Sequence, residues 1–146
     1  MADFVFNVAV GKIAYYSGLP AANDALIAIP IEATGVESDA VLRDYDTVSA
    51  LLAAANNEQS TMGRKTLASV TSTVDDTNNR NNMDAADITW TGATGNPISD
   101  ILICYDPDTT GGTDADLIPL TWHDYPATPD GSDIVATVSD FSRASG

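Results

Sequence analysis

Short apolar runs separated by turn-forming residues fill the stretch from residue 88 to residue 133, and this alternation limits what the chain can fold into. Each run is too short for a helix of ordinary length, whereas loops rich in Gly, Pro, Asp and Thr are typical of connections between strands. The run 101–105 is apolar on both faces and predicts a central strand. The run 117–125 predicts the next strand, with one face formed by Ile118, Leu120 and Trp122.

Similar reasoning predicts further strands at 25–31, 66–74, 88–90 and 134–138. Pro30 cannot donate a ladder hydrogen bond, so we expect an edge or a bulge there. One helix is expected over 47–55, with Asp46 as its N-cap and an apolar face formed by Val48, Leu51, Leu52 and Ala55. The polar segment 75–87 is expected to be an exposed loop or arm.

These expectations define a mainly β, α+β fold: an antiparallel β-sandwich or barrel-like sheet with one short helix packed alongside. Residues 1–146 are expected to form a single domain, which is the simplest organisation for this length. Residues 1–20 are a possible N-terminal arm, because the periodicity of 4–16 does not decide between a strand pair and a helix. The tail 142–146 is expected to be frayed.

The chain is strongly acidic, with 6 basic against 21 acidic residues and a net charge of −15. Because nucleic-acid affinity depends on Lys and Arg displacing counterions from phosphates, this balance excludes DNA and RNA as partners and disfavours anionic membranes. No basic segment precedes the first apolar residues, and no run approaches 18 apolar residues. We therefore expect no signal peptide and no membrane span. The single cysteine, Cys104, excludes an internal disulfide and is expected to be a buried hydrophobe.

Two loops have some features of binding sites. The segment Gly63–Thr66 resembles the end of a phosphate-binding loop, but the required spacing of glycine and lysine is missing, so an exposed basic turn is expected. The loop Asp106–Asp116 alternates oxygen-bearing side chains around Gly111 as a calcium loop does. The position where a bidentate Glu is required is Leu117, so we expect a solvated hairpin loop and no metal site.

Catalytic chemistry is not expected. His123 lies beside Asp124, but the chain has no second histidine and no nucleophile motif, so His123 is interpreted as a partly exposed sheet residue. The many carboxylates make any pairing of acids uninformative. Aromatic residues are interpreted as core, with an interface as the alternative; they are Trp90, Trp122, Tyr15, Tyr16, Tyr45, Tyr105 and Tyr125. The sequence thus predicts no enzyme, no catalytic residue and no cofactor.

Several patterns resemble small structural proteins of tailed bacteriophages. They are the Thr-Trp-Thr strand at 89–91, the apolar run ending in Tyr105-Asp106, the Asp/Gly/Thr loop and the Pro-Asp-Gly turn at 129–131. The segment beginning Arg43-Asp44-Tyr45 is similar to a helix start in this group. The resemblance covers about residues 40 to 135 and marks no catalytic residue.

The resemblance implies a component of the virion, most simply a capsid decoration (cement) protein on the outside of the head that stabilises contacts between capsomers. It also implies the major capsid protein as partner and self-association as a homotrimer, with synthesis in the host cytoplasm. Residues 4–16 would then be the contacting arm. A tail or neck subunit remains the first alternative. A host-facing carbohydrate- or receptor-binding β-domain is the second.

Overall fold

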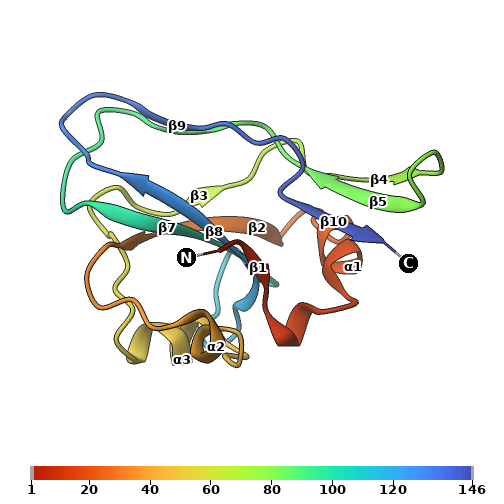
Figure 1. The fold of residues 1–146 in the computed structure, drawn as a ribbon, viewed down its shortest axis with the longest axis horizontal. Helices are drawn as coiled ribbons and strands as arrows, with labels where there is room; N and C mark the ends of the chain where they lie inside the picture. Colours follow the sequence, from red (N-terminus) through yellow and green to blue (C-terminus); the bar gives the residue numbers. More distant parts are fainter. Residues whose placement is uncertain (1, 146) are drawn as a thin grey trace.

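The computed structural model describes residues 2–145 and is mainly β, with antiparallel strands throughout (Figure 1), so the expected α+β class is confirmed. The strands are β1 (Phe4–Val5), β2 (Ala25–Glu32), β3 (Lys65–Thr66), β4 (Thr71–Asp75), β5 (Arg80–Asp84), β6 (Ile88–Trp90), β7 (Ile98–Asp106), β8 (Ile118–Ala127), β9 (Ile134–Ala136) and β10 (Ser142–Ser145). The helices are the 3₁₀ helix η1 (Asn7–Ala9), α1 (Ile13–Gly18), α2 (Asp39–Leu42) and α3 (Val48–Ala53).

A five-stranded sheet in the order β1-β8-β7-β2-β3 forms the centre of the molecule. Its middle strands, β2 and β7, are buried on both faces. Odd-numbered residues of β2 pack with Leu102, Val48 and Leu51 on the side of α2 and α3. Even-numbered residues pack with Ile103 and Trp90 on the opposite side. One sheet therefore separates two apolar cores, which explains why both strands are continuously apolar in sequence.

Two smaller ladders complete the fold. β6 pairs with β9 over the face of the sheet opposite α2 and α3. β4, β5 and β10 form a three-stranded sheet in the order β10-β5-β4, and α1 packs across all three strands. Figure 1 shows this sheet extending away from the body, with the β4–β5 turn at its far end. Met83 anchors its base, because its side chain is fully buried in the core.

The expected N-terminal arm is wrong. β1 pairs with β8, Phe4 opposite Trp122, and both rings are buried with Phe6. The alternation of Phe4 and Phe6 is typical of a strand, but the local sequence does not indicate that their rings pack against Trp122. The expected frayed tail is also wrong over Ser142–Ser145, which pairs with β5 as β10; residue 146 lies outside the described residues.

The expected strand over 66–74 is also wrong, because it is two strands. β3 ends at Thr66, Ser69 adopts a left-handed φ of 53°, and β4 begins at Thr71 with side chains exposed on both faces. The expected loop over 75–87 is irregular only at the turn 76–79 and at 85–87, since Asp75 ends β4 and Arg80–Asp84 forms β5. The β4–β5 hairpin could not be predicted from its sequence, because it is rich in Ser, Thr and Asn and neither face of β4 is apolar.

Three expectations needed smaller corrections. The predicted helix exists as α3, but its N-cap is Thr47, whose Oγ1 accepts a 3.2 Å hydrogen bond from the backbone N–H of Ala50. The structure also contains α1 and α2, where only one helix was expected. Leu120 and Trp122 were expected on one face of their strand, but they lie in different cores. The β7–β8 ladder has a register shift between Ile103 and Cys104, and this bulge lies at Leu120 and reverses the alternation of side chains along β8.

The strands at 25–31, 88–90, 101–105 and 117–125 are confirmed. The final strand is shorter than predicted, since β9 ends at Ala136. Pro30 lies beyond the two-residue pairing of β2 with β3 and next to a bulge between Ile31 and Glu32, in agreement with its missing donor.

Candidate functional site

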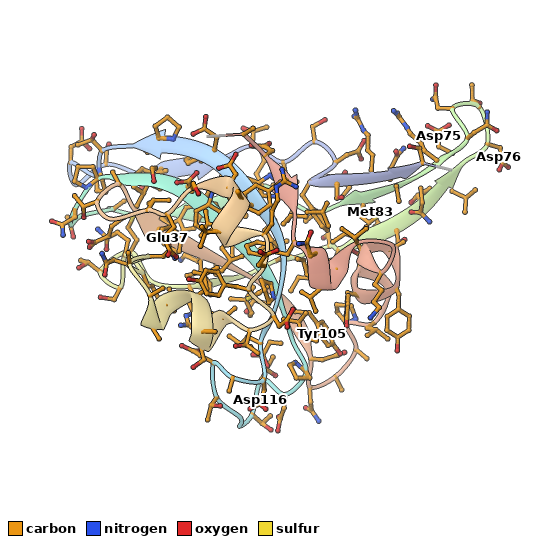
Figure 2. All side chains as sticks on the ribbon, turned by 60° about the horizontal axis from the view of Figure 1, so that its bottom comes forward. Glu37, Asp75, Asp76, Met83, Tyr105 and Asp116 are labelled. Carbon is orange, nitrogen blue, oxygen red and sulfur yellow. The ribbon has the colours of Figure 1, made fainter. Side chains whose placement is uncertain are left out.

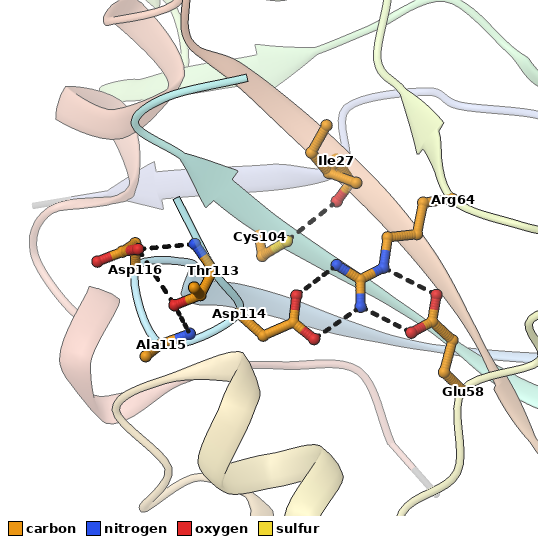
Figure 3. Close-up of polar contacts among 8 residues, drawn as sticks. All are labelled: Ile27, Glu58, Arg64, Cys104, Thr113, Asp114, Ala115 and Asp116. Carbon is orange, nitrogen blue, oxygen red and sulfur yellow. Dashed lines mark hydrogen bonds and ion pairs between the residues drawn. The ribbon is translucent and has the colours of Figure 1, made fainter. Parts of the chain in front are cut away.

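Arg64 ties together two distant loops and is the most strongly bonded cation of the described chain. Its guanidinium donates two hydrogen bonds to Glu58, at 2.8 and 2.7 Å, and two to Asp114, at 2.7 and 3.0 Å (Figure 3). These bonds raise the pKa of Arg64 above its usual range and lower the pKa of Asp114. The expected exposed basic turn is therefore wrong at this residue.

The loop between β7 and β8 is closed by its own hydrogen bonds. Asp108 accepts bonds from the backbone and hydroxyl of Thr110, and Asp116 accepts bonds from the backbone and hydroxyl of Thr113. Among residues 2–145, no three His, Cys, Asp or Glu side chains gather as a metal site would require. Asp108 and Asp116 thus accept bonds from backbone N–H groups of the loop, and Asp114 binds Arg64.

His123 is half-buried on β8, as its interpretation as a partly exposed sheet residue predicted, with 22% of its side chain exposed. Its Nε2 lies 2.9 Å from the hydroxyl of Thr121, and its Nδ1 lies 3.5 Å from Asp3. Burial lowers the pKa of His123, while Asp3 acts in the opposite direction. The neutral form is therefore favoured at neutral pH.

A half-open cavity of about 300 Å³ adjoins His123, between β8 and residues 136–141. Its floor is apolar and includes Ile101 and Phe141. Ser139 also lines the cavity, but the Nε2 of His123 faces the buried hydroxyl of Thr121. The arrangement does not provide a base oriented toward a nucleophile, which serine hydrolysis requires.

Most of the aromatic residues belong to the two cores or to polar contacts between elements. The indole of Trp122 donates a 2.8 Å hydrogen bond to Asp100, and the indole of Trp90 donates one of 2.9 Å to the carbonyl of Gly63. Cys104 is fully buried, as predicted, and burial raises the pKa of its thiol to about 12. Tyr15 differs, since 65% of it is exposed on α1.

The remaining candidate is an interaction surface, which we call the hairpin corner: β4, β5, β10 and the segment 10–18, whose helix α1 packs across the three strands. The three most exposed large hydrophobic residues of the described chain all lie here. They are Val74 at 69%, Tyr15 at 65% and Val10 at 61%. Figure 2 labels Asp75 and Asp76 at the far end of the hairpin and Met83 at its base.

Local bonds keep the end of the hairpin ordered although it projects from the body. Asp75 accepts hydrogen bonds from the backbone and side chain of Asn78 and pairs with Arg80 at 3.2 Å. These contacts lower the pKa of Asp75, with the Asn78 side chain the largest cause. Asn79 adopts a left-handed φ of 51°, which asparagine tolerates in turns. The hairpin is thus a defined surface rather than a loose loop.

Comparison with known proteins gave no relative for this chain: no family model, no curated protein and no solved structure matches it. Among residues 2–145, no helix is long and apolar enough to cross a membrane.

The sequence indicates the two loops and His123 as candidates, but it does not indicate that the loop containing Arg64 is bonded to the loop containing Asp114. Arg64 and Asp114 are 50 positions apart, and no local spacing indicates their contact. The hairpin corner was missed for a similar reason. Tyr15 and Val74 are 59 positions apart, and α1 and β4 become neighbours only through the fold.

Proposed function

We propose that this protein is a structural component of a bacteriophage virion, namely a decoration protein on the outside of the capsid that stabilises contacts between capsomers. Its partners in this proposal are the major capsid protein and further copies of the same chain. It is made in the host cytoplasm, acts in the virion and has no enzymatic role. The proposal rests on the resemblance described above together with the form of the molecule.

The observation that carries the proposal is the hairpin corner. A body with two closed cores extends an ordered three-stranded sheet. Val74 lies on that sheet, Tyr15 lies on the helix that packs across it, and Val10 lies in the turn before that helix. Contiguous exposed apolar patches mark protein–protein contacts, and we take these three side chains as the candidates for such a patch. The other polar clusters, around Arg64 and His123, bond within the chain and present no reactive arrangement.

The net charge supports an exterior position. A capsid interior holds DNA at high density, and a chain with a charge of −15 facing it would be repelled. On the outer surface the same charge faces solvent. A weak contact repeated around a symmetric shell is enough for firm attachment, because each further contact of an assembled unit acts at a high effective concentration.

Quantitative mass spectrometry of purified, DNA-filled particles tests the proposal. We expect close to one copy of this chain per major capsid protein and its removal by protease added to intact heads. A few copies per particle would contradict decoration and indicate a tail or neck subunit. Absence from particles would contradict any structural role, and glycan-array binding by the isolated protein would then favour the host-facing alternative.

A further inference from the structure

We propose that the free edge of β4 pairs antiparallel with β4 of a second copy, joining two chains about a twofold axis that passes beside Thr73. This goes beyond the proposed role in the particle, since it names the surface and the symmetry of self-association. It also replaces the trimer implied by the resemblance with a twofold contact.

The first argument is that this edge lacks protection. β4 is the longest edge strand of the described sheets, and it pairs with β5 over five residues without a register shift. Natural edge strands are protected from pairing by charged side chains, proline, bulges or short length. The edge Thr71–Asp75 has no proline and no bulge, its one charged residue, Asp75, is paired with Arg80, and its threonines and valine favour strands. The edges β1 and β3, by contrast, are two residues long.

The second argument is charge. The three-stranded sheet with its turn, residues 71–84 and 142–145, has three acids and two bases, so it carries −1 of the total of −15. Its Asp75 is already paired with Arg80. In an antiparallel pair centred on Thr73, each Asp75 lies opposite Thr71 of the other copy, so no carboxylate faces another. Self-association through this sheet also keeps the two acidic bodies apart.

The third argument is apolar burial. Ser72, Val74 and Met83 point to the same side of the sheet, because Ser72 lies opposite Met83 in the ladder and Val74 is two positions further along β4. This is the core side, on which α1 packs. Pairing about Thr73 places Val74 of one copy beside Ser72 of the other. Val74, which is 69% exposed in the single chain, is then covered by the edge of the other copy.

This register gives a direct test by disulfide formation. The exchange Thr73→Cys places two cysteines opposite each other across the twofold axis. Directly opposed residues of an antiparallel pair have Cα atoms about 4.5–5.5 Å apart, within the range that a disulfide spans. The native Cys104 is fully buried and does not compete. The matched control is Thr89→Cys, an exposed threonine on β6 in a separate ladder.

We expect light scattering of the isolated protein at about 100 µM to give a dimer, twice 15.2 kDa. Mild oxidation should convert the T73C variant to a covalent dimer at least about tenfold faster than the T89C variant. Val74→Lys should yield a folded monomer, since it places a cation on the edge. Val135→Lys, at a valine of β9 that is 47% exposed against 69% for Val74, should leave the dimer intact.

A monomeric wild-type protein, a trimer, or equal oxidation rates for the two cysteine variants would each overturn the inference. Circular dichroism of the V74K variant verifies folding, and a folded V74K dimer would overturn it as well. The test uses the isolated protein, so its outcome is separate from that of the proposed function. A dimer of a chain absent from particles would uphold the pairing and contradict the decoration role.

Discussion

Arg64 is the single residue whose loss should cost most among the charged groups. Replacing it by methionine keeps the aliphatic stem but leaves Glu58 and Asp114 partly buried without their partner. Because the Arg64 side chain is about one-third exposed, the penalty is smaller than for a fully buried pair, and we expect a loss of about 1–3 kcal/mol in the free energy of unfolding. Urea denaturation measures this loss.

Arg143 provides the control for that substitution. It pairs with Asp140 three positions earlier, and half of its side chain is exposed. The exchange Arg143→Met should change the unfolding free energy by less than about 0.5 kcal/mol. Equal effects of R64M and R143M would mean that the double pairing of Arg64 adds no stability.

Asp100 should make stability depend on pH in the opposite direction from acids whose pKa is lowered in the fold, such as Asp75 and Asp108. Its side chain is fully buried and accepts a bond from the Trp122 indole, and desolvation raises its pKa. The folded state therefore binds this proton more tightly than the unfolded chain, so the stabilising contribution is full below the unfolded pKa and is lost as pH rises through the folded value. Asp100→Asn should increase stability relative to the native chain most at pH 7, and less toward pH 4.

Thermal unfolding of D100N and the native chain between pH 4 and pH 7 measures that difference. Asp108→Asn serves as the comparison, because its bonds with Thr110 lower the pKa of Asp108. Removing Asp108 should destabilise the protein at neutral pH, and the difference should diminish on acidification. A pH-independent difference for D100N would contradict a raised pKa of Asp100.

At the scale of elements, the doubly covered sheet should open only with the whole molecule. Cys104 lies on β7, between β8 and β2, and its thiol contacts the carbonyl of Ile27 at 3.6 Å. Burial raises its pKa to about 12, which suppresses the reactive thiolate. We expect thiol reagents to modify Cys104 at the rate set by global unfolding.

The labelling rate as a function of urea concentration checks this prediction. The opening free energy obtained from the labelling rate should equal the free energy of global unfolding and should depend on urea with the same slope. Modification that is independent of urea would show that β7 becomes accessible by local opening. The T89C variant, whose added thiol is exposed, provides the rate of unprotected labelling.

The elements also show which parts of the fold local sequence can predict. β2 and β7 were predictable, because residues buried on both faces leave a continuous apolar run. The helix α3 was predictable from its apolar spacing. The β4–β5 hairpin was not, since its side chains are polar and its order comes from pairing with β10 and packing on α1. Burial of Phe4 depends in the same way on Trp122, distant in sequence.

The candidate sites divide similarly. The sequence predicts no calcium site in the loop Asp106–Asp116, because Leu117 stands where a bidentate Glu is required, and this stays a prediction. In the structure, Asp108 and Asp116 accept hydrogen bonds from threonines of the same loop. The hairpin corner could not be predicted, because exposure of Val74 and Tyr15 depends on where the sheet projects from the body. Local sequence specifies strands well, whereas it does not specify which surfaces remain uncovered.

For the whole molecule, the net charge of −15 should make stability rise with salt. Repulsion among carboxylates disfavours the compact state, and raising NaCl from 0.02 to 0.5 M shortens the screening length to below about 8 Å. We expect the Tm to increase by about 2–4 °C for each kcal/mol of repulsion removed. Differential scanning calorimetry at pH 7 measures the change.

Calcium chloride at matched ionic strength separates screening from binding. Screening alone should give the same rise in Tm for both salts once ionic strength is equal. A larger rise in Tm with calcium would indicate a bound ion, and the acids of the loop Asp106–Asp116 would then be the first residues to replace by mutagenesis. An unchanged or lower Tm in NaCl would contradict net repulsion in the folded state.

The sheet that separates two cores has a consequence for how this sequence can diverge. A strand with one solvent-exposed face tolerates substitution at every second position, but β2 is buried at each residue from Ala25 to Ile31. Drift along that strand is restricted to apolar exchanges of similar volume. Packing within the chain places no such restriction on the exposed side chains of β4, which only the proposed contact with a second copy constrains. Descendants of a common ancestor should therefore share two unbroken apolar segments, 25–31 and 101–105, even where that contact has been lost and their hairpins no longer resemble one another.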